Sequence, residues 1–267
     1  EVTVLGTPTD ISTARQANVG DMVHTSGVVY AQYDGGYNIT DGTDALAIYT
    51  AEAIADQSLT MGDEVEVYGQ LNQYNSLYQI ADIGKEEVLS SGNTTTMPVD
   101  TSETVTSITG KDSSVRALHG QAFEITGVLD IRGTYNNVWI DDPNASGSLV
   151  VYYQSPADSI TALEDKVGDT VTLTVYYHMD DGNAVHVLYQ DGVSGITPGT
   201  DQGKLDADID ALEDVWTDGD DITLPVNGTY GTSFSGWTSS DTSLIDDTGA
   251  FVSTPSSITT ITMTGTA

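Results

Sequence analysis

The chain has 267 residues, with 40 acidic residues, 7 basic residues and no cysteine, and its formal net charge is -33. The lack of cysteine excludes disulfide bonds, thiolate catalysis and cysteine-based zinc sites. The excess of acid argues against nucleic acid as a partner, because affinity for a phosphate backbone rests largely on Lys and Arg. The same excess favours divalent cations and solubility in salt. No apolar run is long enough to span a membrane.

The pattern of the chain predicts an all-β fold, because helical patterns are scarce while Thr, Val, Tyr and Ile are frequent. The segment 1–7 alternates like a strand and ends before a proline. Short helices are expected at residues 9–17 and, from its alanine content, at 50–59. The order of five strands with a helix between the third and the fourth is that of an oligonucleotide/oligosaccharide-binding (OB) barrel. The expected strands cover residues 22–33, 37–40 and 45–49 and a hairpin at 62–80.

The hairpin that begins at residue 62 recurs later in the chain. Residues 62–65 and 168–171 share a Gly-Asp pair that leads into an alternating strand, and each strand is followed by a polar turn and a returning strand. We therefore expect two five-stranded OB-like barrels in tandem, at residues 8–90 and 101–198. The Ser, Thr, Gly and Pro content of residues 91–100 predicts a linker between them.

The first of these regions resembles a family of bacterial extracellular OB-type domains, which are found beside secreted nucleases and other cell-surface proteins. The resemblance covers residues 8–90 and implies an accessory module, because in that family the chemistry lies in a separate domain that this chain lacks. The segments that carry it, in order, are 11–15, 27–29, 37–42, 62–65 and 74–80.

The remaining residues, 199–267, begin with an amphipathic helix at 201–216 and continue as short strands at steady spacing. The Trp-Thr-Ser-Ser-Asp sequence at 237–241 and the later Gly-Ala-Phe-Val at 249–252 resemble an atypical bacterial immunoglobulin-like domain. The resemblance implies a β-sandwich that lacks its last strand. The apolar face expected for the helix consists of Leu205, Ile209 and Leu212.

The segment 1–7 has the character of a final immunoglobulin-type strand, and three explanations are open. The chain is one period of a longer array of modules, or its first strand completes the terminal domain of the next molecule, or that strand pairs within its own barrel. The second case is β-strand addition, which generates fibres when it does not close into a ring. The donor would be Glu1, Val2, Thr3, Val4, Leu5 and Gly6. The acceptor would be Trp237, Phe251, Val252, Ile261 and Met263.

Catalytic and metal motifs are scarce. The chain has no Gly-x-Ser-x-Gly, phosphate-loop or His-Glu-x-x-His sequence, so we expect no enzyme. His178 and His186 would lie on one hairpin near Asp180 and Asp181, where they form a metal site or simply face solvent. No cofactor is expected except Ca²⁺, for which flexible turns offer Asp141, Asp142, Asp218, Asp220 and Asp221.

Tyrosines give the first barrel a candidate ligand platform, because aromatic side chains on this fold stack against bases or sugars. The candidates are Tyr30, Tyr37, Tyr49, Tyr74 and Tyr78. Given the acidic surface, a neutral glycan fits better than nucleic acid. The function expected is a non-catalytic structural or adhesive module of the cell exterior, secreted and self-associating end to end into a filament or surface array. The alternative is an accessory region of a secreted hydrolase that binds its glycan or nucleic acid substrate.

Overall fold

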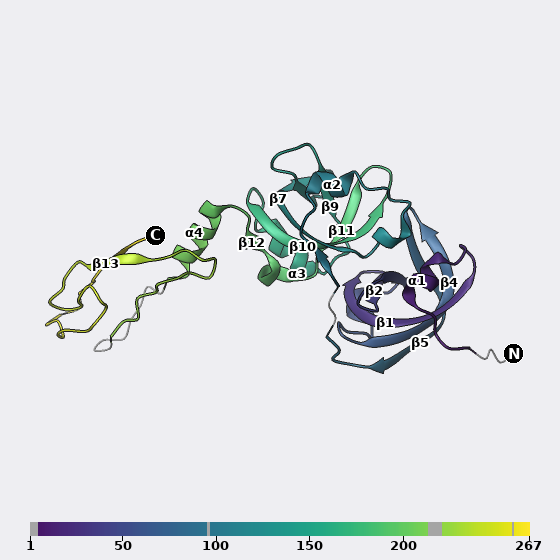
Figure 1. Ribbon diagram of the computed structural model, residues 1–267, viewed down its shortest axis with the longest axis horizontal. Coiled ribbons are helices and arrows are strands. Elements are labelled where there is room, and N and C mark those ends of the chain that lie inside the picture. The colour runs from purple at the N-terminus through teal and green to yellow at the C-terminus, as the bar shows by residue number, and fades with distance from the viewer. Residues whose placement is uncertain (1–4, 95–96, 213–220, 258) are drawn as a thin grey trace. The chain divides into compact units, whose positions relative to one another are not determined.

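The computed structural model describes residues 5–94, 97–212, 221–257 and 259–267 (Figure 1). Strands predominate and helices are few and short, so the predicted all-β class is confirmed. The chain divides into unit 1, Glu1–Thr197, and unit 2, Pro198–Ala267.

Unit 1 contains a closed five-stranded barrel, as predicted. Its strands are β1 (Met22–Tyr33), β2 (Gly36–Thr40), β3 (Ala45–Tyr49), β4 (Glu64–Tyr74) and β5 (Leu77–Ser90), and they close in the order β1-β2-β3-β5-β4. Four of the pairings are antiparallel, whereas β3 and β5 run parallel. This closed, five-stranded arrangement is OB-fold-like.

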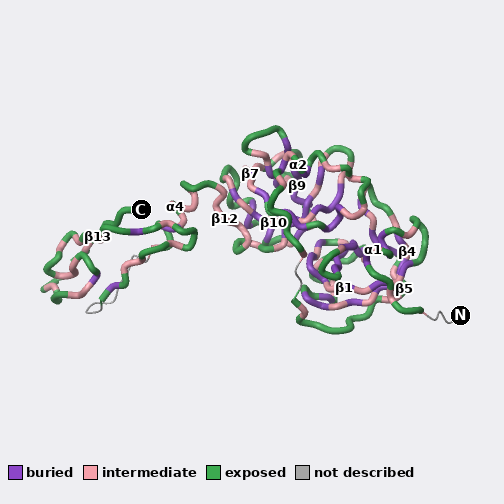
Figure 2. The backbone as a smooth tube through the Cα atoms, in the orientation of Figure 1, coloured by how far each residue is buried: buried purple, intermediate pink, exposed green. Residues whose placement is uncertain are grey.

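Alternation of apolar and polar residues explains how β4 fits this barrel. Val65, Val67 and Leu71 are fully buried in its interior, while Glu64 and Glu66, which alternate with the two valines, are partly exposed. A strand places successive side chains on opposite faces, so one face of β4 forms the core and the other meets solvent (Figure 2).

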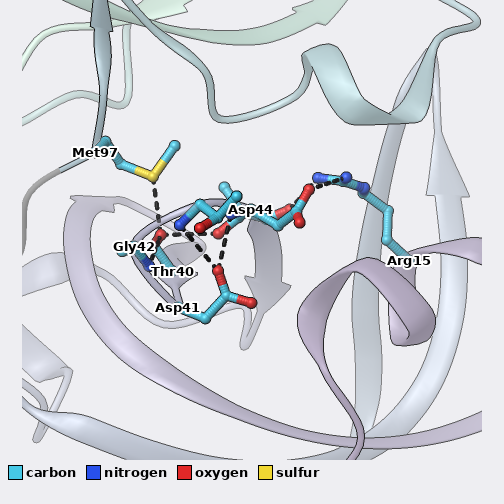
Figure 3. Close-up of polar contacts among 8 residues, drawn as sticks. Arg15, Thr40, Asp41, Gly42, Asp44 and Met97 are labelled. Atoms are coloured by element: carbon cyan, nitrogen blue, oxygen red, sulfur yellow. Dashed lines mark hydrogen bonds and ion pairs between the residues drawn. The ribbon is translucent and has the colours of Figure 1, made fainter.

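Helix α1 (Ile11–Gln16) packs against the core of this barrel through Ile11 and Ala14 and lies where the sequence predicts a helix. Its buried Arg15 donates to the carbonyl of Ala45 at 3.0 Å and forms an ion pair with Asp44 in the β2–β3 turn (Figure 3). In the same turn, Asp41 accepts hydrogen bonds from the backbone N–H groups of Thr43 and Asp44. A charged side chain that is buried needs such partners, and Arg15 thereby joins the helix to the barrel.

The helix predicted at 50–59 is wrong, because this segment contains only the 3₁₀ turn η1 (Ile54–Asp56). Ala51 adopts a left-handed φ of 63°. The N–H of Gly35 donates to the carbonyl of Glu52, and Asp34 accepts from the N–H of Ile54. These bonds to the β1–β2 turn replace the i to i+4 bonds of a helix, despite the favourable alanines.

A second sheet in unit 1 repeats the pairing of the first. It contains β6 (Val99–Asp100), β7 (Ala122–Arg132), β8 (Asn137–Asp141), β9 (Ser148–Val151), β10 (Thr170–Asp180), β11 (Val185–Leu188) and β12 (Thr197–Pro198), in the order β12-β10-β11-β9-β8-β7-β6. Because β10 also pairs with β7, five strands form a circuit in the same order as the first barrel, and β9 and β11 run parallel as β3 and β5 do.

Short helices accompany this second sheet. Helix α2 (Val105–Thr109) and the turn η2 (Arg116–Leu118) precede β7, α3 (Ala157–Glu164) lies between β9 and β10, and η3 (Gly192–Gly195) follows β11. No residues were assigned to helix α3 from the sequence, although it lies between the third and fourth strands of the circuit, where an OB barrel has a helix. Its buried residues are Ser159, Ala162 and Leu163.

Unit 2 contains helix α4 (Asp201–Asp210), the paired strands β13 (Ser235–Ser239) and β14 (Met263–Thr266), and two isolated bridges. The helix was expected, but its predicted apolar face is not buried as proposed, because Ile209 is 44% exposed while Asp208 is buried. Asp208 accepts from the N–H groups of Tyr230 at 2.8 Å and Thr232 at 3.1 Å. Burial opposes its ionisation, but these hydrogen bonds prevail and lower its pKa.

Most of the predicted donor strand, Glu1 to Val4, lies outside the described residues. Leu5 and Gly6 are described and belong to no strand. Farther on, Thr9 forms an isolated parallel bridge with Thr25. The pairing of residues 1–6 therefore stays a prediction. Within the described part of the chain, no helix is long and apolar enough to cross a membrane.

Candidate functional site

The closed barrel and the five-strand circuit of the second sheet, here called the second barrel, share a buried interface. Its apolar residues from the first barrel are Tyr30, Ala31, Tyr33, Ala45, Ala47 and Leu77, and those from the second are Tyr152, Met179 and Leu188. Hydrogen bonds cross the same surface: the hydroxyl of Tyr30 donates to the carbonyl of Gly120 at 3.0 Å, and the N–H of Asp34 donates to the carbonyl of Gln154 at 2.8 Å. The barrels are therefore packed against each other through apolar and polar contacts.

Arg116 extends this interface to the end of helix α1. Its guanidinium donates to the carbonyls of Arg15 at 2.6 Å and Ala17 at 2.7 Å. The same group lies over the ring of Tyr78, 3.9 Å from its centroid. A cation at the carboxyl end of a helix and above an aromatic face is favourable on both counts.

The tip of the β4–β5 hairpin contacts strand β10. The N–H of Asp180 donates to the hydroxyl of Ser76 at 2.7 Å, and the N–H of Ser76 donates to the carbonyl of Asp180 at 3.3 Å. Asn75 beside it has a left-handed φ of 53°, which a two-residue turn requires and Asn tolerates. The hairpin that begins the repeat in the sequence is thus also a point of contact between the two copies.

A cleft of about 990 Å³ runs beside this interface and takes residues from both barrels. Three exposed tyrosines line it: Tyr49 (43% exposed) at the end of β3, Tyr74 (56%) at the end of β4, and Tyr153 (65%) just after β9. Amide side chains of Asn72, Gln73, Gln79 and Gln154 also line the cleft. Exposed aromatic faces next to amide donors and acceptors are typical of a site for a polar ligand with apolar faces.

The charge in the cleft is negative. Its charged lining residues are Asp34, Glu52, Asp82 and Glu86, and no Lys or Arg stands among the lining residues that the structure describes. Glu86 accepts a hydrogen bond from the hydroxyl of Tyr37 at 2.7 Å. Anionic ligands are therefore disfavoured here.

Part of the cleft wall is formed by buried rings. His178 (2% exposed) packs against Tyr33 (3%) and Tyr152, with ring centroids 4.9 and 4.6 Å away. Burial, reinforced by His186 and His119, lowers the pKa of His178 to about 3, so its imidazole is neutral at ordinary pH. Within the described residues, neither the Tyr33 hydroxyl nor His178 Nδ1 has a hydrogen-bond partner.

The predicted tyrosine platform is corrected in three of its five positions. Tyr49 and Tyr74 line the cleft, but Tyr30 and Tyr37 are buried, and the face of Tyr78 is covered by Arg116. Tyr30 faces the second barrel and Tyr37 belongs to the barrel core. The prediction missed Tyr152, Tyr153 and His178, which come from the second barrel.

The carboxylates proposed for Ca²⁺ have protein partners where they are described. Asp141 pairs with Arg132, Asp142 accepts from the N–H groups of Thr106 and Asn144, and Asp221 accepts from the N–H of Phe251. Asp218 and Asp220 lie outside the described residues. In the part of the chain that is described, no group of three His, Asp or Glu side chains is placed to hold a metal ion. The hairpin that carries His178 and His186 therefore shows no such group among its described residues. Binding of Ca²⁺ stays a prediction.

Unit 2 has an apolar groove of about 570 Å³. Three of the predicted acceptor residues, Trp237, Ile261 and Met263, line it together with apolar residues such as Ile222 and Leu224. Phe251 forms an isolated bridge with Ile245, and Val252 is 52% exposed; both lie outside the groove lining. The structure thus brings three of the five acceptor residues to one surface.

No protein-family model and no curated protein matches the sequence. Among solved structures, the chain is similar to the hypothetical protein ygiW from E. coli, with 17% identity over 32% of this chain and 91% of that one and a TM-score of 0.26. It is also similar to a murine DNA binding protein bound to double-stranded DNA (10% identity, 63% and 93% covered, TM-score 0.29). A third likeness is to a replication protein A heterotrimer bound to single-stranded DNA, with 8% identity over 78% of this chain and 72% of that one and a TM-score of 0.25.

These low scores carry no statement about what this chain binds, and the OB-fold-like description rests on the strand order of the barrel. The similarity to DNA-bound proteins does not support the expectation that nucleic acid is not a partner of this chain. That expectation stays a prediction.

Proposed function

We propose that this chain is a non-catalytic adhesive module of the cell exterior that holds a carbohydrate in the cleft between its barrels. The observation that carries the proposal is the convergence of Tyr49, Tyr74 and Tyr153, from both barrels, on one cleft. The proposed domains are a first strand at 1–7, OB-type barrels at 8–90 and 101–198 with a linker at 91–100, and an immunoglobulin-like domain at 199–267. Residues Val99 and Asp100 of that linker pair with β7.

A carbohydrate suits the composition of the cleft. Tyrosine rings stack on the apolar face of a sugar ring, and amide and carboxylate side chains accept and donate the hydrogen bonds that its hydroxyls need. A nucleic acid backbone would instead bring phosphates beside Asp34, Glu52, Asp82 and Glu86, with no Lys or Arg among the described lining residues to offset them. Of the two ligands considered for an accessory binding region, the lining of the cleft therefore favours a carbohydrate over a nucleic acid.

The test is calorimetric titration of the full chain with cello-, chitin- and chitosan-oligosaccharides and with oligothymidylate. We expect at least one carbohydrate to bind and a Tyr74→Ala, Tyr153→Ala double variant to bind it about thirtyfold more weakly, because two stacking contacts are lost and each costs about 1 kcal/mol. Tyr135→Ala is the matched control, since Tyr135 is 87% exposed and does not line the cleft. Binding of oligothymidylate alone, or an equal loss in the control, would refute the proposal.

A second function, end-to-end self-association, is favoured by the groove of unit 2. A strand contributed by another molecule would cover the apolar side chains of Trp237, Ile261 and Met263. Removing this apolar surface from water would stabilise the contact between the two molecules. The alternating sequence of residues 1–6 supplies a strand of suitable character. Repeated head-to-tail contacts of this kind would build a filament or surface array.

Deleting residues 1–6 should abolish this assembly. Light scattering and electron microscopy of the intact chain at increasing concentration are expected to show a rising mass and end-to-end particles, while the shortened chain stays monomeric. If the intact chain is monomeric throughout, or if the deletion leaves the oligomers unchanged, strand donation is not its mechanism.

A further inference from the structure

The cleft has a charge pattern that a neutral sugar does not need. Asp34, Glu52, Asp82 and Glu86 line it, and within the described residues none of these four carboxylates is part of an ion pair. Glu52 and Asp82 are both exposed, the first just after β3 and the second within the neighbouring strand β5. Like charges left uncompensated around one cleft repel one another, and a cationic ligand would relieve that repulsion.

Two buried polar atoms give an independent indication of a ligand. Tyr33 and His178 are each more than nine-tenths buried and line the cleft, and neither the Tyr33 hydroxyl nor His178 Nδ1 has a hydrogen-bond partner in the described part of the chain. Buried polar groups are ordinarily satisfied, and one that is not costs about 1–3 kcal/mol. Both atoms are themselves shielded from solvent, so a ligand with donors and acceptors would reach the phenol hydroxyl and the neutral imidazole nitrogen only after a shift of the wall that exposes them.

The tyrosine rings fit the same class of ligand. Tyr49, Tyr74 and Tyr153 present exposed rings beside the carboxylates, and an ammonium group is attracted both to the face of a tyrosine ring and to a carboxylate. Hydroxyl groups on the same molecule would meet the four amide side chains of the lining. One chemical class combines ammonium groups, hydroxyls and apolar ring faces.

We propose, resting on the proposed function of carbohydrate binding, that the cleft selects carbohydrates that carry free amino groups. Each ammonium would lie against an exposed tyrosine and a carboxylate such as Glu52 or Asp82, and the sugar hydroxyls would bond to the amide side chains of the lining. N-acetylation removes the positive charge of the amine. The acetylated and free forms of one oligosaccharide therefore differ in the charged group that the carboxylates and tyrosines of the cleft would bind.

The experiment compares chitosan and chitin oligosaccharides of equal length by calorimetry with the full chain, at pH 6 and at low and high salt. We expect the free-amine form to bind about tenfold more tightly at low salt, because two partly exposed ion pairs each contribute about 0.5–1 kcal/mol, and the preference should shrink at high salt. Equal affinity for the two forms would overturn this inference while leaving carbohydrate binding in place. Binding of neither form would overturn this inference alone if a cello-oligosaccharide still binds, and it would remove the proposed function as well if none of the three binds.

Matched variants separate the cleft from the general negative charge of the chain. Glu52→Gln with Asp82→Asn should remove most of the preference for the free amine and leave binding of the acetylated form within about twofold. Glu124→Gln with Glu164→Gln changes the net charge equally at exposed carboxylates outside the cleft and should leave the preference intact. An equal loss in both pairs, or displacement of the oligosaccharide by millimolar Ca²⁺, would assign the effect to bulk charge or to a metal and would overturn the proposal.

Discussion

Replacing Gly120 with alanine is expected to lower the free energy of unfolding of unit 1 by about 3 kcal/mol. Gly120 has a left-handed φ of +81°, and a Cβ atom there would lie 2.4 Å from the hydroxyl oxygen of Tyr30 and 2.5 Å from Cβ of Ala45. The left-handed backbone costs a residue with a Cβ about 1–2 kcal/mol, and overpacking costs about 1–3 kcal/mol more. Both neighbours belong to the first barrel, so the clash acts directly on the interface.

Gly133→Ala is a close control. Gly133 has a φ of +80°, nearly the same backbone conformation, but no atom lies within 4 Å of the position that its Cβ would take. We expect this variant to lose only the backbone cost, about 1 kcal/mol. Urea unfolding followed by near-ultraviolet circular dichroism suits the comparison, because every tyrosine except Tyr230 lies in unit 1. Equal losses in the two variants would mean that the barrel interface does not stabilise unit 1.

Removing the Arg116 side chain is the second change with a large expected effect. Arg116→Ala deletes the charge-assisted bonds to the carbonyls of Arg15 and Ala17 and the contact with the Tyr78 ring. Bonds of this kind contribute about 1.5–3 kcal/mol, and the two carbonyls are left at the end of helix α1 without these donors. We expect unfolding to become easier by about 2–3 kcal/mol and hydrogen exchange to rise in residues 11–17.

Arg132→Ala serves as its control. Arg132 pairs with Asp130 and Asp141 and lies 5.4 Å from the centroid of the Trp139 ring, so all of these contacts stay within the second barrel. Ion pairs this exposed contribute about 1 kcal/mol or less. Exchange in residues 11–17 should not change in this variant. If Arg116→Ala leaves that exchange unaltered, Arg116 does not hold the helix to the second barrel.

The strands of the first barrel could be predicted because their core pattern is local. In β4 the alternation of Val65, Val67 and Leu71 with polar residues fixes which face is buried, and the chain repeats that pattern in β10. The same rule fails at the end of β1, where Val29, Tyr30 and Ala31 are all buried. The second barrel covers the outer face there, and such long-range packing leaves no period in the sequence.

The cleft could be predicted only in part for the same reason. Tyr49 and Tyr74 were identified from the first barrel, but Tyr153 and His178 join them only because the second barrel packs alongside. Tyr30 is not part of the ligand platform for the same reason, because the second barrel packs on it and buries it. A run of four apolar residues at 28–31 was the available indication, since continuous apolar runs are typical of strands buried on both faces.

One helical prediction failed, and one helix was not assigned from the sequence, because tertiary contacts outweighed local preference. The alanines of 50–59 favour a helix, yet hydrogen bonds to the β1–β2 turn hold this segment in another conformation. Helix α3 forms from eight residues, of which only half are apolar, because Ala162 and Leu163 are buried. Helices this short are marginal in isolation and depend on packing. In α4, Asp208 is buried because it accepts hydrogen bonds from the backbone N–H groups of Tyr230 and Thr232. The pattern of apolar and polar residues along the helix does not indicate these long-range partners.

The central claim, that the cleft between the barrels binds a carbohydrate, is tested most directly by nuclear magnetic resonance of the full chain with ¹³C-labelled tyrosine rings. Chitosan and chitin oligosaccharides are added in turn. The ring resonances of Tyr49, Tyr74 and Tyr153 are expected to shift together with one saturable affinity, while those of Tyr135 and Tyr230 stay in place. Saturable shifts confined to Tyr135 or Tyr230, or no shift at the three cleft tyrosines with either sugar or with a cello-oligosaccharide, would contradict the claim.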